Sequence, residues 1–222
     1  MADIHYLENP LETEELLELL CPPVRNWFRD KFPDFTEPQK LAIPAIMNQD
    51  HLLLCSPTGS GKTLTAFLSI IDQLVRRALD NNLDKRVYCV YISPIKALAN
   101  DIERNLIGPL TEISESYLPS RAQEIKVGLR TGDTPQSERQ KMLRNPPHIL
   151  ITTPESLAIA ITSPRFQPIV SEVEYMIVDE LHSLVPSKRG VHLALTLSYL
   201  DTLLTRPVQR SVSLRQWSLL KQ

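Results

Sequence analysis

Short, mostly apolar runs recur along the chain and alternate with stretches in which apolar residues follow a helical spacing. The runs are His51–Cys55, Val87–Ile92, His148–Thr152 and Val173–Val178. Each has the length of a strand, and the lack of polar alternation is typical of strands that are covered on both faces. The alternation of such runs with amphipathic segments predicts an α/β fold, in which a parallel sheet carries helices on both faces.

Helix starts are marked by capping residues and by the spacing of apolar positions. The predicted helices are Thr13–Leu20, one from Thr36, one from Leu64, one from Pro154, and one from Val191 to about Leu204. Thr13 and Thr36 are the predicted N-caps of the two N-terminal helices, and Pro38 suits the first turn of the second one. From Leu64 the apolar residues recur every three or four positions, which indicates a helix with one buried face.

The segment SPTGSGKT, residues 56–63, joins the first apolar run to the helix from Leu64. It matches the phosphate-loop pattern GxxxxGK[ST], except that Ser56 stands at the first glycine. In this pattern backbone N–H groups face phosphates, Lys62 neutralises their charge and the Thr63 hydroxyl ligates Mg²⁺. The predicted nucleotide-binding residues are Ser56, Thr58, Gly59, Ser60, Gly61, Lys62 and Thr63. An accidental glycine-rich turn is the alternative, which the flanking strand and helix disfavour.

Two acidic residues, Asp179 and Glu180, follow the last apolar run. A carboxylate at the end of a buried strand can hold Mg²⁺, which is the predicted role of Asp179. Hydrolysis needs a base within hydrogen-bond reach of water, which is the predicted role of Glu180. Alone, such a pair is most often a solvated turn. Beside a phosphate loop, the catalytic interpretation is favoured, with Lys62 as the third catalytic residue.

Five segments, SPTGSGKT, YISPIKALANDI, RTGDT, ILITTPESL and IVDELH, occur in the order seen in superfamily 2 DEAD/DEAH-box-like helicases. Together they resemble the Lhr (large helicase-related) family over about Trp27 to Arg210. The resemblance implies a three-layer, RecA-like P-loop NTPase domain that uses ATP and Mg²⁺. It also implies 3′ to 5′ movement on single-stranded nucleic acid, more often DNA than RNA, and a second RecA-like domain that completes the site.

The resemblance also assigns roles to individual residues. Gln39 would read adenine, since an amide offers both a donor and an acceptor. His182 would couple the ATP site to a later motif. The residues that would contact nucleic acid are Ser93, Pro94, Lys96, Arg130, Thr131, Gly132, Thr153 and Pro154. Small hydroxyls, helix N-termini and a lysine suit phosphates. All these positions also have a plainer interpretation, because the same residue types cap helices or fill turns.

The aromatic cluster Trp27, Phe28, Phe32 and Phe35 leaves two interpretations. The rings could stack an adenine or seal an edge of the core, and the core is preferred because large aromatic side chains most often serve there.

After Arg210 the resemblance calls for a segment such as IGLSATM, but the chain reads SVSLRQW over Ser211–Trp217. Deleting one base from a coding sequence for QRIGLSATM yields QRSVSLRQW. A frameshift is therefore our hypothesis for this tail, and ordinary divergence is the alternative. The predicted division is a helical extension over 1–26, a RecA-like domain over 27–210 and an atypical tail over 211–222.

Composition limits other classes. With 222 residues and 42% hydrophobic content, the chain can bury one substantial core. Its net charge of −2 excludes a wholly basic surface but permits a local basic track. The basic residues near the predicted track are Lys126, Arg130, Arg139, Lys141 and Arg144. Three cysteines without a CxxC pair indicate reduced thiols rather than disulfides or a zinc site. No leader and no apolar run of membrane-spanning length are recognisable, so we expect a cytoplasmic protein without a membrane partner.

Three functions from different classes remain open. The chain could be the ATP-binding part of a helicase, weakly active or inactive without the second domain. It could be a regulatory module that binds ATP or single strands without unwinding, or the inactive product of an interrupted gene. A small-molecule kinase is disfavoured by the nucleic-acid motifs.

Overall fold

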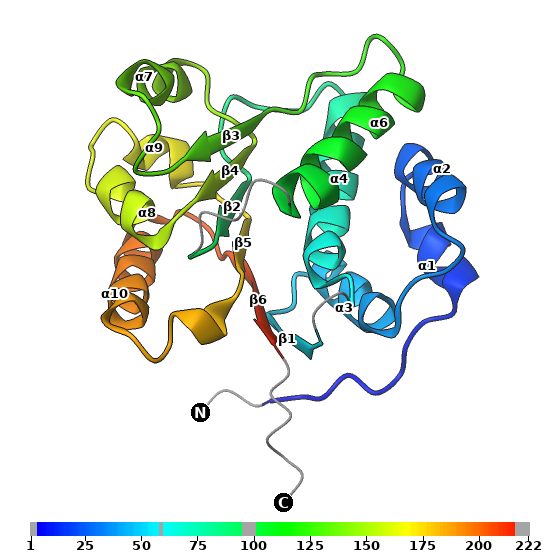
Figure 1. Ribbon diagram of the computed structural model, residues 1–222. Helices are drawn as coiled ribbons and strands as arrows, with labels where there is room; N and C mark the ends of the chain where they lie inside the picture. The colour runs from blue at the N-terminus through cyan, green and yellow to red at the C-terminus, as the bar shows by residue number, and fades with distance from the viewer. Residues whose placement is uncertain (1–3, 58–59, 95–100, 216–222) are drawn as a thin grey trace, which may run out of the picture.

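In the computed structural model, which describes residues 4–57, 60–94 and 101–215, the described part of the chain forms one six-stranded sheet between two layers of helices. The strand order is β1-β6-β5-β2-β4-β3, and all neighbouring strands are parallel. Figure 1 shows the sheet in the middle, with α1 to α4 and α6 on one side and α7 to α10 on the other. The predicted three-layer α/β fold is confirmed.

The strands are β1 (Leu52–Ser56), β2 (Cys89–Ile92), β3 (Val127–Arg130), β4 (Ile149–Thr152), β5 (Tyr175–Val178) and β6 (Gln209–Arg215). Three of the four apolar runs contain one of these strands, and each of these three strands ends where its run ends. Strand β1 extends one residue past its run, to Ser56. Strand β6 was not among the predicted runs. It lies between β1 and β5 and continues the sheet past the Arg210 boundary.

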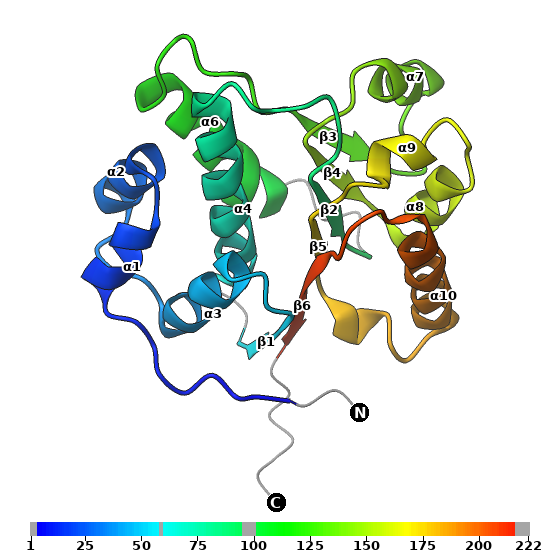
Figure 2. The same ribbon diagram turned by 180° about the vertical axis from the view of Figure 1, so that it is seen from behind.

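The helices of the first layer are α1 (Thr13–Leu19), α2 (Pro22–Lys31), α3 (Glu37–Met47), α4 (Lys62–Leu79), a π-helix (Glu103–Ile107) and α6 (Gly108–Ser116). Those of the second layer are α7 (Gln136–Arg144), α8 (Pro154–Ile161), α9 (Gln167–Val170), a 3-10 helix (Leu181–Ser183) and α10 (Lys188–Leu203). Figure 2 shows the same two layers from behind.

Each central strand supplies alternate side chains to two separate cores. In β2, Cys89 and Tyr91 pack in the core under α1, α2, α4 and α6, whereas Val90 and Ile92 pack in the core under α8 to α10. Successive side chains of a strand point to opposite faces, so an uninterrupted apolar run fills both cores. This explains why the runs lacked polar alternation.

The N-terminal helices begin almost as predicted, with one correction. The N-cap of α1 is Glu12, whose N–H donates to Glu15 Oε2 at 3.1 Å. Thr13, the predicted cap, is the first helical residue, and its hydroxyl donates to Asp34 instead. The tertiary partner Asp34 thus competes successfully for the Thr13 hydroxyl. Thr36 is the N-cap of α3, as predicted, with Pro38 in the first turn.

Three rings of the aromatic cluster lie in the core. Trp27, Phe28 and Phe35 are buried, and the rings of Phe28 and Phe35 stack with their centroids 3.8 Å apart. Phe32 is exposed and packs on Phe28 from outside. The preferred core interpretation is therefore confirmed for Trp27, Phe28 and Phe35.

The predictions on cysteines and on membrane-spanning segments can be compared with the described residues. The three cysteines are free thiols, and Cys21 and Cys89 are buried. Within residues 4–57, 60–94 and 101–215, none of the helices combines the length and apolar character needed to cross a membrane.

Candidate functional site

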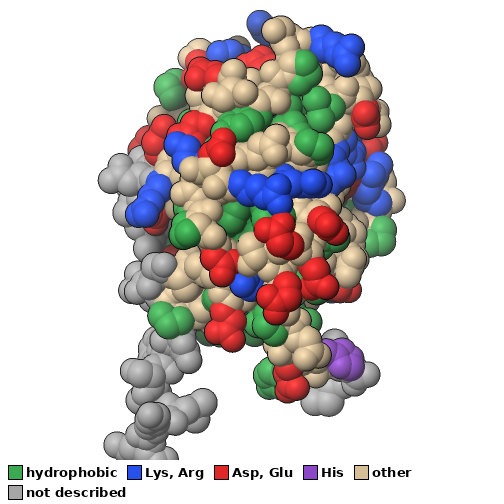
Figure 3. Space-filling view, turned by 90° about the vertical axis from the view of Figure 1, so that its right-hand side faces the viewer, with side chains coloured by type: hydrophobic (Ala, Val, Ile, Leu, Met, Phe, Trp, Pro, Cys, Tyr) green, Lys and Arg blue, Asp and Glu red, His purple; other side chains and the backbone are tan. Residues whose placement is uncertain are grey.

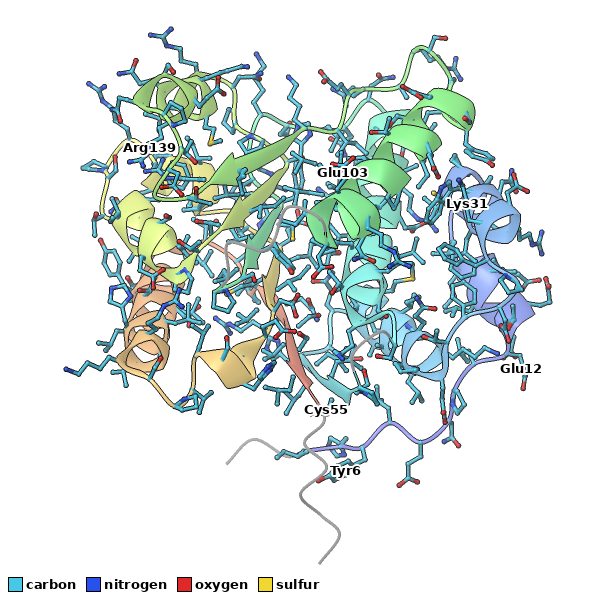
Figure 4. The ribbon with its side chains drawn as sticks, in the orientation of Figure 1. Tyr6, Glu12, Lys31, Cys55, Glu103 and Arg139 are labelled. Atoms are coloured by element: carbon cyan, nitrogen blue, oxygen red, sulfur yellow. The ribbon has the colours of Figure 1, made fainter. Side chains whose placement is uncertain are left out.

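The predicted site residues follow the carboxyl ends of the strands, at one edge of the sheet. Strands β1, β6 and β5 form one half of this edge, and β2, β4 and β3 form the other. Ser56 ends β1 and Asp179 follows β5, whereas Ser93, Thr153 and Thr131 follow β2, β4 and β3. We call these halves the acidic half and the hydroxyl half. Figure 4 labels Cys55 on β1 and Arg139 on α7, near the opposite ends of the sheet.

In the acidic half, the predicted phosphate loop connects β1 to α4, as the pattern requires. Gly61 is the N-cap of α4 and has a φ of 82°, in the left-handed region that favours glycine. A Cβ at Gly61 would lie 3.1 Å from Gln39 Nε2, so the loop passes close to α3. The backbone angle favours glycine here, and a Cβ would also have to move the end of the Gln39 side chain. Thr58 and Gly59 lie outside the described residues.

The loop makes several bonds to itself. Lys62 Nζ donates to the carbonyl oxygens of Ser56 and Pro57 at 2.5 and 2.6 Å. The hydroxyls of Ser56 and Ser60 are 2.6 Å apart. An incoming phosphate would have to replace the two carbonyl partners of Lys62. Ser56, which stands at the first glycine of the pattern, is thus hydrogen-bonded to Ser60 of the same loop.

Gln39 lies beside this loop and also caps its own helix. Its Oε1 accepts a hydrogen bond from Thr36 N at 2.8 Å, and the Thr36 hydroxyl donates to Ser60 O at 3.1 Å. The capping interpretation is confirmed. The adenine-reading role remains a prediction, and the position of Gln39 next to Gly61 is compatible with it.

Asp179 is buried and has three hydrogen-bond donors. Tyr91 Oη donates to its Oδ2 at 2.5 Å, the Ser213 hydroxyl donates to its Oδ1, and Glu180 N donates to the same oxygen at 2.8 Å. The three donors come from β2, β6 and the segment after β5. This arrangement fixes the carboxylate at the strand end.

Glu180 adopts a left-handed conformation, with a φ of 54°. Such an angle is uncommon outside glycine and turns the chain sharply after β5. The Glu180 carboxylate then lies 3.1 Å from His182 Nε2. The predicted base and the predicted coupling residue are therefore in contact.

A small cavity joins the two predicted motifs of the acidic half. Lys62, Thr63, Asp179, Tyr91 and Ser213 are among the residues that line it. Within the described residues, no group of three or more His, Cys, Asp or Glu side chains could hold a metal ion. A cation bound here would take its ligands from one carboxylate, one hydroxyl and the phosphates of a nucleotide. This donor set suits Mg²⁺, which keeps few protein ligands at phosphate sites.

In the hydroxyl half, the described part of the turn after β2 is shielded from solvent. Ser93 and Pro94 are both buried, and Ser93 N donates to Thr152 O at 3.1 Å on the neighbouring strand. Lys96, the predicted lysine contact, lies outside the described residues.

The turn after β3 is held by an arginine of α7. Arg139 donates to the carbonyl oxygens of Thr131, Gly132 and Thr134 at 3.2, 2.9 and 2.9 Å. Gly132 is exposed. Arg139 is thus a structural clamp for this turn, as well as one of the basic residues noted in the sequence.

Arg130 faces the interior. Its guanidinium lies 4.8 Å from the centroid of the Phe166 ring, and burial, together with the nearby Arg139, lowers its pKa. The side chain packs as a cation over an aromatic ring. Contact between Arg130 and nucleic acid stays a prediction.

Thr153 and Pro154 form the start of α8. Thr153 is the N-cap, and its hydroxyl accepts from Ser156 N at 3.3 Å, while Pro154 occupies the first turn. Thr153 and Pro154 can both start the helix and lie in a phosphate-binding surface, because helix N-termini attract anions. Glu155, in the same turn, pairs with Arg189 of α10.

Two basic residues near the predicted track, Lys126 and Lys141, have local partners. Lys126 Nζ donates to Asn145 Oδ1 at 3.1 Å, and Lys141 lies 4.0 Å from Glu138. The face around α1, α2 and α6 is mixed as well, with acidic and basic side chains side by side in Figure 3. These observations favour the plainer interpretation of the basic residues, a solvated surface.

Three contact residues were missed by sequence reasoning: Tyr91, Ser213 and Arg189. Only Tyr91 left a signal, as a hydroxyl within an apolar run. Ser213 and Arg189 act through partners that are distant in sequence. Arg139 was noted for its charge, but its bonds to the turn after β3 were not expected.

Comparison with known proteins places the chain. Residues 36–214 match the DEAD/DEAH box helicase family. Over 203 residues the chain is 50% identical to the ATP-dependent helicase Lhr-Core of Methanocaldococcus jannaschii, covering 90% of this chain and 24% of that relative. It thus spans about a quarter of the length of this relative.

Two solved structures have a similar fold. The Mycobacterium smegmatis helicase Lhr bound to ssDNA and AMP-PNP matches with a TM-score of 0.78 and 43% identity, over 89% of this chain and 25% of that one. The DEAD-box helicase Mss116 bound to ssRNA and UDP-BeF matches with a TM-score of 0.76 over 95% of this chain and 42% of that one. At 21% identity, Mss116 supports the fold alone.

Proposed function

Since the chain belongs to the DEAD/DEAH box helicase family, we propose that it supplies the ATP-binding domain of a motor that moves 3′ to 5′ on single-stranded nucleic acid. The observation that carries this proposal is the meeting of Lys62, Thr63 and Asp179 around one cavity at the carboxyl ends of β1, β6 and β5. ATP would bind there, with its phosphates at the start of α4.

Each residue of the acidic half has a defined task in this proposal. Lys62 exchanges its two carbonyl partners for phosphate oxygens. Thr63 and Asp179 are the residues that would hold Mg²⁺, which neutralises charge on the phosphates when it is bound. The Tyr91 hydroxyl keeps the Asp179 carboxylate oriented toward the cavity.

Glu180 is the proposed base. It would accept a proton from the attacking water, because its carboxylate follows Asp179 directly and the sharp turn at Glu180 sets its direction. His182 contacts this carboxylate and is the proposed coupling residue.

Single-stranded nucleic acid would bind along the hydroxyl half. The support is a set of caps, backbone amides and helix starts, which recognise phosphates without reading bases. We propose DNA as the preferred strand, because the similar M. smegmatis helicase Lhr is bound to ssDNA.

The test is ATP hydrolysis by the purified chain with and without single strands. Single-stranded DNA and RNA of equal length should be compared, beside a version extended through the restored reading frame. The family resemblance implies a second domain that adds an arginine finger, and such fingers are worth roughly a thousandfold or more in turnover in other phosphate-loop enzymes. Strand-stimulated turnover only in the extended version would support our proposal of an ATP-binding part. Absence of nucleotide binding in both versions would refute the proposed site.

The frameshift origin of the tail also remains a proposal. Reading the gene tests it directly, since an intact helicase continuation one frame away supports a single-base deletion. Absence of such a continuation would mean that Ser211–Arg215, which completes β6, diverged in the ordinary way.

A further inference from the structure

Arg189, in the first turn of α10, bonds to both of the turns that follow the neighbouring strands β2 and β4 of the hydroxyl half. Its Nε and one terminal nitrogen donate to the two carboxylate oxygens of Glu155 at 2.6 and 3.2 Å. The same terminal nitrogen donates to Pro94 O at 3.0 Å. Pro94 follows β2 and Glu155 lies in the first turn of α8 after β4, so one side chain connects both proposed phosphate-binding turns.

The position of Arg189 is fixed by its neighbours. A Cβ at Gly190 would lie 2.7 Å from Leu184 O, so only glycine lets the start of α10 approach the turn at Leu184 so closely. The Ser187 hydroxyl donates to Leu184 O at 2.8 Å and accepts from Arg189 N at 3.2 Å, which caps the helix. Since Leu184 is fully buried, this start is anchored in the core.

The contact requires an arginine. A planar guanidinium can bind a carboxylate with two parallel hydrogen bonds and still reach a carbonyl, whereas an ammonium is a point charge. The hydrogen bond from Arg189 also lowers the pKa of Glu155, so the carboxylate is ionised and paired at neutral pH. Both side chains are nearly half exposed, and such pairs add little to overall stability. The main contribution of this pair is therefore to fix the positions of the two turns that Arg189 contacts.

We propose that Arg189 is a positioning residue, which holds the turn after β2, through the Pro94 carbonyl, beside the start of α8, so that the hydroxyl half keeps the shape that binds the phosphates of one strand. The pairing also offsets the negative charge of Glu155, which would otherwise repel phosphate at the α8 N-terminus. This inference rests on the proposed binding of single strands by the hydroxyl half.

The test measures binding of a fluorescently labelled single-stranded oligonucleotide by anisotropy, using the full chain. Arg189→Ala and Arg189→Lys should both weaken binding, by about tenfold. Lys188→Ala is the matched control, because it removes one charge from the same turn, and it should have a much smaller effect. Nucleotide affinity and melting temperature should change little in all three variants.

Glu155→Gln separates positioning from simple charge. Removing a negative charge near a phosphate strand would by itself strengthen binding. Loss of the anchor for Arg189 should instead weaken it, and the double variant with Arg189→Ala should bind no worse than Arg189→Ala alone. Tighter binding by Glu155→Gln, or unchanged binding by Arg189→Lys, would overturn the inference. If the parent chain binds neither DNA nor RNA strands, the proposed function itself fails, and the inference fails with it.

Discussion

The two halves of the carboxyl edge are held in place by different means. In the acidic half, side chains bond to one another across strands, and Asp179 takes hydroxyl donors from Tyr91 and Ser213. In the hydroxyl half, arginines of α7 and α10 bond to main-chain carbonyls of the turns, as Arg139 and Arg189 do.

This difference has a functional consequence. Fixing a carboxylate through its own oxygens sets the position of a chemical group, which suits a reaction. Fixing carbonyls sets the shape of a surface, which suits an extended strand whose bases are not read. Substitutions of the reacting groups in the acidic half should therefore change turnover or nucleotide binding, whereas substitutions in the hydroxyl half should change strand binding. Substitutions of residues that support either half should change stability.

The largest effect is expected for Glu180→Gln. Loss of a general base should lower ATP turnover by about 10²- to 10⁴-fold, while nucleotide binding and strand binding without ATP stay near the parent values. Hydrolysis and nucleotide binding should be measured on the same preparation.

Lys62→Ala supplies the contrast for Glu180→Gln, because it should weaken nucleotide binding itself. Parent-like hydrolysis by Glu180→Gln would show that the base is a different group.

The next largest effect is expected for Tyr91→Phe, which removes a donor to the Asp179 carboxylate. Hydrogen bonds to charged groups are worth about 1.5–3 kcal/mol, so the free energy of unfolding should fall by about that much. Tyr88→Phe is the matched control, since the Tyr88 hydroxyl accepts only a neutral main-chain bond from Asp84 N at 2.9 Å. Its cost should be about 0.5–1.5 kcal/mol. Equal losses in urea titrations would contradict the special role of Tyr91.

Gly190→Ala tests the packing that supports the hydroxyl half. The new methyl group would meet the Leu184 carbonyl, and overpacking of this kind costs about 1–3 kcal/mol. Gly132→Ala is the control, because a Cβ there meets nothing within 4 Å, and the change should stay within about 0.5 kcal/mol. Denaturant unfolding measures both, and a larger loss at Gly132 would refute this account.

The smallest effect concerns His148, just before β4. Burial, and secondarily the charge of Lys126, lowers its pKa below the ordinary value of 6.5, so the folded state favours the neutral ring. The stability from this ring is therefore fully present above pH 6.5 and is lost as the pH falls through the lower folded-state pKa. His148→Asn keeps an acceptor for Lys126 N, which bonds to His148 Nδ1 at 3.1 Å, but does not titrate. Its unfolding free energy should vary less than the parent's below pH 6.5, and identical slopes would count against the buried ring.

Much of the fold follows from local sequence. Apolar runs predict buried strands, and the phosphate-loop pattern predicts the strand before it and the helix after it. The predictable elements were therefore β1, β2, β4, β5, α4 and α8. Strand β6 was not, because its Ser211 and Ser213 carry polar side chains inside a sheet. Their burial depends on partners such as Asp179, which no local pattern reveals.

The candidate site shows the same division. Lys62, Asp179 and Glu180 were found from motifs, since their chemistry depends on spacing along the chain. Arg189 was missed, because its partners Pro94 and Glu155 come from distant turns. The resemblance assigned Arg130 to nucleic acid, but no local pattern revealed that its side chain packs on Phe166, a contact made by the fold.

The strand order carries a consequence for how the molecule assembles. Strand β1 pairs with β6, and β6 alone joins it to β5, although β6 is the last described strand to be synthesised. Contacts between segments so far apart form slowly, because a long loop must close first. During synthesis on the ribosome, β2 to β5 can form their part of the sheet first. Among the described strands, β1, which precedes α4, has no strand to pair with until β6 is synthesised. A nascent chain that stops short of Gln209 would leave the edges of β1 and β5 open to pairing with other chains. Pairing with β6 therefore protects both strands from aggregation.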